Sequence, residues 1–313
     1  MSTTLASLGA LEASRRLRAE GLLVRTGPFV YRLRADLPAI DAHIQVLYGR
    51  HAVAQADDYV DFDVAIRRVW RPKGGWQLAF ESDGERPFAL MPVAHANPLL
   101  EWAMNWCVAT QVKHQVLIHA AVLERGGRAL VMPAPPGSGK STLCAGLMLS
   151  GWRLLTDEMA LLTMDASPQL LPLGRGVSLK NRSIEVIRAF HPGAVFTQVT
   201  HDTVKGSIAH LQPLAEHVAR LDEPATPAWV VFPQFGADAP TAITPLPRPA
   251  TLLDLMGQSF NAEQLGLPAF RALTAMLAQS TCHHVSFGSL GAALQAIDHL
   301  TQTQAETQEP AHA

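Results

Sequence analysis

A short glycine-rich segment carries the clearest chemical pattern in this chain. It reads Gly137-Ser138-Gly139-Lys140-Ser141, with the apolar run 129–132 before it and the apolar run 143–149 after it. Small residues let successive backbone N–H groups turn toward one anion, and the positive end of a helix dipole adds to that field. A strand, a glycine-rich turn and a helix in this order are the context in which such a loop binds phosphate. The sequence therefore predicts a site for the phosphates of a nucleotide.

The individual residues of this loop have separate expected roles. Lys140 would reach the β- and γ-phosphates, and the Ser141 hydroxyl would ligate a magnesium ion. The expected phosphate contacts come from one continuous run: Pro136, Gly137, Ser138, Gly139, Lys140, Ser141 and Thr142. Ala134 stands where the pattern G-x-x-x-x-G-K-[ST] has its first glycine. Because alanine is strained at positive φ, we expect the start of this loop to differ from that pattern.

Two adjacent acids, Asp157 and Glu158, follow the apolar run 153–155 and begin seventeen positions after Lys140. An acid at the carboxyl end of a strand beside a phosphate loop can hold magnesium, directly or through water. Neighbouring residues on an extended chain point to opposite sides, so one acid could face the metal and the other an attacking hydroxyl. The alternative interpretation is a solvated turn at the end of a strand.

Other chemically active residues are less specific. His119 lies in the apolar run 117–122, where an isolated histidine is more often a hydrogen-bonded core residue than a catalyst. Arg175 and Lys205 are downstream cations that could face the nucleotide phosphates, with solvated surface residues as the alternative. The pair His283-His284 has no third metal ligand at useful spacing and indicates a strand edge, and Cys144 indicates packing.

The combined spacing resembles that of the HPr kinase/phosphorylase family. His119, Lys140 and Asp157 follow one another at intervals of 21 and 17 residues, and the similarity covers roughly residues 115–165. The segments Val177–Asn181 and Thr200–Gly206 are similar to segments of the HPr-kinase-related branch of that family. The family's signature glutamate followed by an Arg-Gly-Leu-Gly run is represented only by Leu173-Gly-Arg-Gly-Val177, without the nearby glutamate.

The resemblance implies an α/β fold with a P-loop kinase core of the HPr kinase/phosphoenolpyruvate carboxykinase type, a mixed sheet flanked by helices. In that family Asp157 would be the base that takes a proton from a serine hydroxyl. Glu158, where the family usually has aspartate, would assist with the metal, and His119 would orient or tune Asp157. The implied cofactors are ATP and Mg²⁺.

The function expected from this resemblance is an ATP-dependent kinase that phosphorylates a serine, or another hydroxyl, of a protein or peptide. Two alternatives are a small-molecule kinase on the same fold and a nucleotide-binding regulatory module without transfer activity. The second acid argues against the module, because binding alone does not need it. The missing glutamate leaves the reverse, phosphorolytic reaction open, and the sequence does not identify the acceptor.

The elements that must position these residues follow from periodicity and turn residues. We expect strands on both sides of the turn 26–28, a helix over 37–50, a strand over 59–69, a hairpin over 76–91, a helix over 97–113, a strand over 116–123, and helices over 250–257, 262–278 and 288–300. The expected organisation is an N-terminal α/β accessory region (1–95) that recognises the acceptor, a catalytic domain (96–300) and a frayed tail (301–313).

Composition narrows the remaining choices. The 313 residues are 48% hydrophobic, which excludes a wholly disordered chain. Twenty-five basic and 27 acidic residues give no basic excess, so we expect no nucleic-acid partner. Three scattered cysteines, no secretory leader pattern and no membrane-length apolar run favour a cytoplasmic protein without a membrane partner. The oligomeric state, a homo-oligomer included, is left open.

Overall fold

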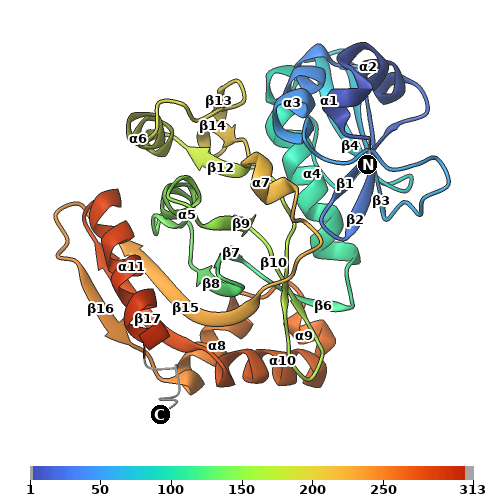
Figure 1. The fold of residues 1–313 in the computed structure, drawn as a ribbon. Helices are drawn as coiled ribbons and strands as arrows, with labels where there is room; N and C mark the ends of the chain where they lie inside the picture. The colour runs from blue at the N-terminus through green and yellow to red at the C-terminus, as the bar shows by residue number, and fades with distance from the viewer. Residues whose placement is uncertain (1–2, 307–313) are drawn as a thin grey trace. The chain divides into compact units, whose positions relative to one another are not determined.

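The computed structural model describes residues 3–306, and the chain forms two compact units. Within the described residues, unit 1 contains residues 3–112 and 172–222, and unit 2 contains residues 113–171 and 223–306. Both units are mixed α/β, as the sequence predicts (Figure 1). The expected boundary near residue 95 differs from this division, because the helix that follows it and the whole segment 172–222 belong with the N-terminal residues.

Unit 1 is built from two sheets and the helices beside them. Its helices are α1 (Leu5–Leu8), α2 (Ala10–Arg18), α3 (Pro38–Tyr48), the 3-10 turn η1 (Val93–His95), α4 (Ala96–Gln111), α6 (Arg182–Phe190) and α7 (Ala215–Val218). Its strands are β1 (Leu22–Thr26), β2 (Phe29–Ala35), β3 (Phe62–Arg71), β4 (Gly75–Glu81), β5 (Met91–Pro92), β12 (Val177–Lys180), β13 (Thr200–Thr203) and β14 (Gly206–Leu211).

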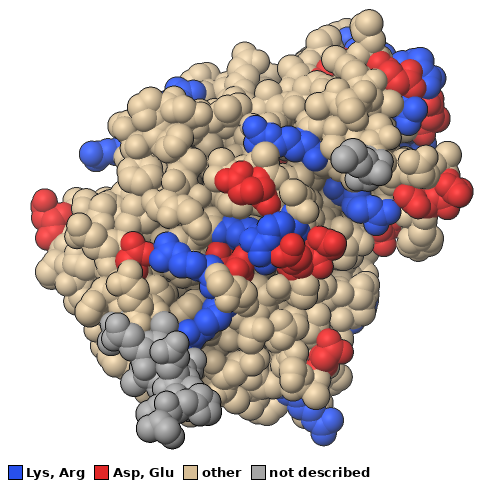
Figure 2. All heavy atoms as spheres, in the orientation of Figure 1, with Lys and Arg blue, Asp and Glu red and all other residues tan. Residues whose placement is uncertain are grey.

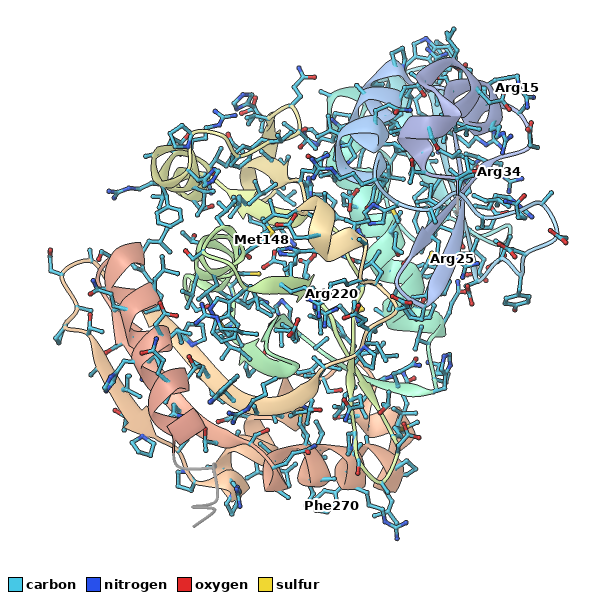
Figure 3. The ribbon with its side chains drawn as sticks, viewed as in Figure 1. Arg15, Arg25, Arg34, Met148, Arg220 and Phe270 are labelled. Atoms are coloured by element: carbon cyan, nitrogen blue, oxygen red, sulfur yellow. The ribbon has the colours of Figure 1, made fainter. Side chains whose placement is uncertain are left out.

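The larger sheet of unit 1 has the order β1-β2-β3-β4-β5, with β2 and β3 parallel and the other neighbours antiparallel. Arg34 on β2, labelled in Figure 3, donates to Asp63 on β3 at 2.7 Å. Helix α4 packs on β3 and β4 through apolar residues at helical spacing, of which Leu99, Leu100 and Cys107 are buried. The hairpin expected over 76–91 does turn after Glu81, where Ser82 bridges Glu85, but β5 covers two residues, so the second strand is much shorter than expected.

The second sheet of unit 1 brings together the segments Val177–Asn181 and Thr200–Gly206. Its order is β12-β14-β13, all antiparallel. Asn181, which follows β12, donates its backbone N–H to Ser207 at 2.9 Å, and its side-chain oxygen accepts from the Ser207 N–H at 3.0 Å. The two segments therefore form one local structure although about twenty residues separate them.

Unit 2 also contains two sheets. Its strands are β6 (Gln115–Ile118), β7 (Ala120–Arg125), β8 (Arg128–Pro133), β9 (Arg153–Thr156), β10 (Ala160–Thr163), β11 (Leu170–Leu171), β15 (Thr226–Phe235), β16 (Ala242–Pro245) and β17 (Thr281–Phe287). Its helices are α5 (Lys140–Leu149), α8 (Arg248–Gly257), α9 (Ala262–Leu265), α10 (Leu267–Ala278) and α11 (Leu290–Glu306). The sheet orders are β16-β17-β15-β8-β7-β9 and β11-β10-β6.

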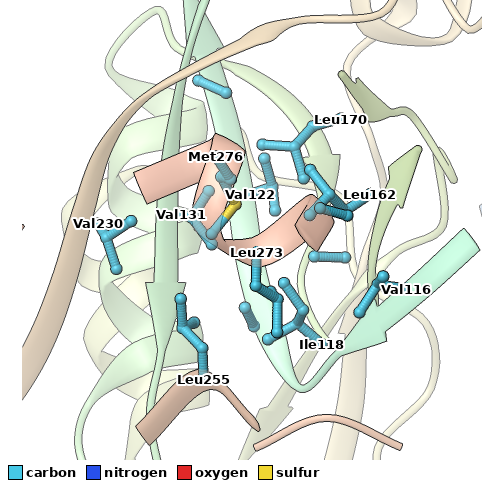
Figure 4. Packing of buried hydrophobic residues seen from close by; sticks show 14 of the residues in the cluster. Val116, Ile118, Val122, Val131, Leu162, Leu170, Val230, Leu255, Leu273 and Met276 are labelled. Carbon is cyan, nitrogen blue, oxygen red and sulfur yellow. The ribbon is translucent and has the colours of Figure 1, made fainter. Parts of the chain in front are cut away.

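The core of unit 2 lies where α8 and α10 pack on both sheets (Figure 4). Side chains from both sheets and both helices meet there: Val116, Ile118, Val122, Val131, Leu162, Leu170, Val230, Leu255, Leu273 and Met276. Burial of so many branched side chains contributes most of the stabilising free energy of this unit, at about 25 cal/mol per Å² of apolar surface removed from water. Strands β7, β8 and β15 therefore share one apolar core with α8 and α10.

Four expectations about unit 2 need correction. The strand expected over 116–123 is two strands in different sheets, broken at His119, because the segment 258–261 hydrogen-bonds along β6 and Gln258 accepts the His119 N–H at 2.8 Å. The helix expected over 262–278 is divided at Gly266 into α9 and α10. His283 and His284 lie on β17, which pairs on both sides and is not an edge. Residues 301–306 of the expected tail belong to α11, and 307–313 lie outside the described residues.

Charges of both signs lie next to one another on the face shown in Figure 2, without one extended basic surface. Within residues 3–306, no helix combines the length and the apolar character that crossing a membrane requires.

Candidate functional site

The strand directions of unit 2 bring the expected site residues to one sheet edge. Strands β8, β15 and β17 are parallel, so Pro133, Phe235 and Phe287 end at the same edge. Strands β8 and β9 are both antiparallel to the intervening β7 and therefore run in the same direction. Asp157, directly after β9, therefore emerges at the edge where β8 enters the glycine-rich loop. Carboxyl ends of parallel strands are where ligands bind in α/β sheets.

The loop between β8 and α5 has the backbone that its glycines allow. Gly137 has a φ of +87° and Gly139 a φ of +85°, both in the left-handed region. Ala134, at the position of the missing first glycine, is buried and is not among the residues with positive φ, so alanine fits there without strain. Gly139 precedes α5 and provides no side-chain cap, so the first N–H groups of this helix are directed toward the loop.

Two phenylalanines hold the loop in place. A Cβ on Gly139 would lie 2.9 Å from Cβ of Phe235 and 3.1 Å from Cζ of Phe287, so only glycine fits at this position. The Phe235 N–H donates to the Ser138 carbonyl at 2.9 Å, and the two phenylalanine rings are 6.0 Å apart. We did not predict either residue from the sequence. The available signal was that both strands end in the same dipeptide, Phe235-Gly236 and Phe287-Gly288.

Lys140, Asp157 and Cys144 form a buried group next to this loop. Lys140 is 7% exposed, Asp157 is 5% exposed and Cys144 is fully buried. Burial, and then the charge of Asp157 and a hydrogen bond with it, raises the pKa of the Cys144 thiol well above its ordinary value, while Lys140 acts in the opposite direction. These interactions require the three side chains to be close together. The sequence indicated only packing for Cys144, although it lies one helical turn after Lys140 (Met148, one turn further, is labelled in Figure 3).

The two acids differ in their surroundings. Asp157 is buried, whereas Glu158 is partly exposed. The Met159 N–H donates to the Thr156 hydroxyl at 3.3 Å and closes a turn around both acids. Two adjacent carboxylates with different exposure can take different roles, the buried one close to Lys140 and the other accessible from solvent.

The strand register places His119 alongside these acids. Val122 on β7 is opposite Thr156, and Ile118 on β6 is opposite Ala160. The three residues 119–121 must therefore run beside the three residues 157–159. The His119 ring is partly buried and lies 5.8 Å, centroid to centroid, from the ring of Phe260, which is 44% exposed. His119 therefore belongs to the same sheet edge as the loop and the acids.

The donor atoms suit magnesium bound together with phosphate. Ser141 supplies a hydroxyl and Asp157 and Glu158 supply carboxylates, and oxygen ligands of this kind are those that Mg²⁺ prefers. The Ser138 hydroxyl oxygen, also in the loop, is buried and has no hydrogen-bond partner among the described residues. Within residues 3–306 there is no cluster of three or more His, Cys, Asp and Glu side chains that could bind a metal alone. The hydroxyl of Ser141 and the carboxylates of Asp157 and Glu158 fit a magnesium ion whose other ligands would be phosphate oxygens of a nucleotide.

The two other predicted cations lie in unit 1. Arg175 is 6% exposed and pairs with Glu101 at 2.6 Å, while it also donates to Asn105 and, at 3.3 Å, to the Tyr48 hydroxyl. This buried network occupies its guanidinium group and gives it a structural role. Lys205 lies on the exposed turn between β13 and β14, with Nζ 5.5 Å from the centre of the Trp102 ring. Its contact with a nucleotide stays a prediction.

The comparisons with known proteins provide no family assignment. No family model matches the chain, and no curated protein is significantly similar to it.

Proposed function

We propose that the chain is an ATP-dependent phosphotransferase that moves the γ-phosphoryl group to a serine, or another hydroxyl, of a protein or peptide acceptor. The observation that carries this proposal is the convergence of the loop 137–141, the acids Asp157 and Glu158, and His119 at one edge of the unit 2 sheet. The sequence resemblance to the HPr kinase/phosphorylase family supports the same activity, with a P-loop core of the kind that this family shares with phosphoenolpyruvate carboxykinases.

The proposed reaction is an in-line transfer. Asp157 accepts the proton of the acceptor hydroxyl, whose oxygen forms a new bond to the γ-phosphorus. The bond from that phosphorus to the β,γ-bridging oxygen breaks, and ADP leaves with the electron pair. Lys140 and the backbone N–H groups of the loop stabilise the charge on the phosphate oxygens. A magnesium ion held by Ser141 and Glu158 would neutralise part of that charge when bound.

The test follows label from γ-labelled ATP, with the full chain, into three fractions: polypeptide, small molecules and inorganic phosphate. Lys140→Ala removes a charge-assisted contact worth roughly 1.5–3 kcal/mol, so ATP affinity and transfer should both fall. Lys113→Ala is the matched control, because Lys113 is exposed and donates to Gln264 at 2.7 Å. Label in polypeptide supports the proposal, and label in a small molecule indicates the alternative kinase. ATP binding without transfer to any fraction indicates a regulatory module.

A second experiment tests whether Asp157 and Glu158 have different roles. Asp157→Asn should abolish transfer while magnesium–nucleotide binding persists, because an amide cannot accept the proton. Glu158→Gln should instead raise the magnesium concentration needed for half-maximal rate. The same defect in both variants would contradict this division of roles.

The role of His119 is tested by the pH dependence of turnover per folded molecule. If His119 orients Asp157, His119→Asn should lower the rate by roughly 10²–10⁴ and change the profile between about pH 5 and 8. If it is a core residue, the variant should lose stability and keep a parallel profile with an unchanged plateau.

A further inference from the structure

The distal half of the β3–β4 hairpin, residues 67–77, extends past the pairing of β3 with β2 and of β4 with β5 as a two-stranded ribbon. Strand β2 pairs with β3 as far as Ile66, and β5 pairs with β4 at Gln77 and Leu78. From Arg67 to Arg71, β4 is therefore the only described strand that pairs with β3. None of the residues 67–77 is buried, whereas Ile66 and Phe80 at the base of the ribbon are.

Two tryptophans occupy the middle of this ribbon. Trp70 lies directly opposite Trp76, and the Arg68 guanidinium lies 5.7 Å from the centre of the Trp76 ring. These contacts stabilise a two-stranded structure that would otherwise be marginal in water. They nevertheless leave Trp70 56% and Trp76 57% exposed. Exposed tryptophan beside arginine is the composition that carries binding energy at protein interfaces.

The charge of the ribbon has one sign. Four cations, Arg67, Arg68, Arg71 and Lys73, lie within it, and there is no acid between Asp63 and Glu81. Arg67 lies 3.8 Å from Glu81 and Arg68 lies 3.6 Å from Asp36. Arg71 and Lys73 form no ion pair with a described residue. The tip of the ribbon is therefore complementary to an acidic partner.

The outer edge of β3 determines the kind of partner. Backbone N–H and C=O groups along residues 67–71 face away from β4 at alternate positions and can hydrogen-bond to another extended backbone. Cations on this edge repel a second copy of the same ribbon and attract a strand that carries carboxylates. A nucleic acid or a lipid headgroup supplies negative charge but no backbone to complete the sheet.

We propose that residues 67–77 form a docking arm for an extended acidic segment of a protein partner. The segment adds to β3 as a strand, places carboxylates against Arg71 and Lys73, and packs an apolar side chain on Trp70 and Trp76. This binding function goes beyond phosphoryl transfer and does not depend on it.

The first test measures binding of poly-L-glutamate to the full chain by calorimetry at low and high salt. We expect salt-sensitive binding that weakens roughly tenfold or more in the double variant Arg71→Glu/Lys73→Glu. The control is Arg182→Glu/Arg188→Glu, which changes the net charge equally on exposed positions of α6 and should bind like wild type. No binding of polyglutamate, or equal weakening in both double variants, would overturn the proposal.

The second test uses tryptophan emission. Polyglutamate should change the emission of wild type, and Trp70→Ala/Trp76→Ala should lose that change while circular dichroism shows a folded chain. If this variant does not fold, the charge-reversal pair still decides the question. Anionic phosphatidylserine vesicles and oligothymidylate are tested in parallel, and binding of either one without polyglutamate binding would also refute a polypeptide partner.

Discussion

Gly139→Ala tests whether the loop is held as the structure indicates. The φ of Gly139 is +85°, and an alanine in this region costs roughly 1–2 kcal/mol. The new Cβ would also lie 2.9 Å from Phe235 and 3.1 Å from Phe287. Displacing the buried Phe287 and the half-exposed Phe235 at the ends of β17 and β15 costs about another 1–3 kcal/mol. Together these terms predict a loss of about 2–5 kcal/mol in the free energy of unfolding.

Substitutions at two other glycines distinguish the cost of backbone strain from the cost of displacing the phenylalanines. Gly137 and Gly151 have φ values of +87° and +93°, and a Cβ on either meets nothing within 4 Å. Alanine at either position should therefore cost only the roughly 1–2 kcal/mol of backbone strain. Urea unfolding gives the three stabilities, and calorimetry gives the ATP affinities, which should fall for Gly137→Ala and Gly139→Ala but not for Gly151→Ala. If Gly139→Ala costs no more than Gly151→Ala, the packing argument is wrong.

Three further predictions concern buried groups. Cys144→Ala should lower the rate of phosphoryl transfer several-fold at unchanged ATP affinity, and Cys144→Ser should restore the rate because its hydroxyl can still donate to Asp157. Equal rates in wild type and both variants would show that Cys144 does not position Asp157. Arg175→Met should destabilise the protein by about 3–5 kcal/mol, because Glu101 is left buried without its cation. The double variant Arg175→Met/Glu101→Gln should recover much of that loss. A fall in ATP affinity without a loss of stability would instead indicate that Arg175 contacts the nucleotide. Burial lowers the pKa of His51 to about 4 from its ordinary 6.5, so on acidification the unfolded chain binds a proton before the folded chain does. The free energy of unfolding should therefore decrease as the pH is lowered from 6.5 to about 4, by about 3 kcal/mol in all. Urea unfolding should show this slope flattened in His51→Gln and unchanged in the exposed control His191→Gln.

Local patterns were sufficient to predict much of the fold. The turn at Gly27-Pro28 predicted β1 and β2, apolar spacing predicted α4, and Lys140-Ser141 between two apolar runs predicted β8 and α5. In each case a few neighbouring residues determine the conformation through turn chemistry, periodicity or a helix start.

Contacts between distant residues could not be predicted in this way. Arg175 has the sequence surroundings of an exposed loop cation, but its partner Glu101 lies 74 positions away on α4. The same limit applies to Phe235 and Phe287, which become neighbours of Gly139 only because β8, β15 and β17 are parallel. The grouping of residues 172–222 with the N-terminal residues likewise depends on contacts across the chain and has no local signal.

The break at His119, which periodicity did not predict, explains why the candidate site is at this edge. The chain passes from one sheet of unit 2 to the other at two neighbouring points. It leaves β6 for β7 at His119, and it leaves β9 for β10 across residues 157–159. A continuous strand over 116–123 would commit His119 to a regular ladder opposite a continuous partner. The two sheet changes instead leave His119 and residues 157–159 outside the regular strands, where side chains are not confined to the alternation of a sheet. Because β6 ends at Ile118 and β7 begins at Ala120, while β9 ends at Thr156 and β10 begins at Ala160, this freedom is limited to His119 on one segment and to residues 157–159, with Asp157 and Glu158, on the other.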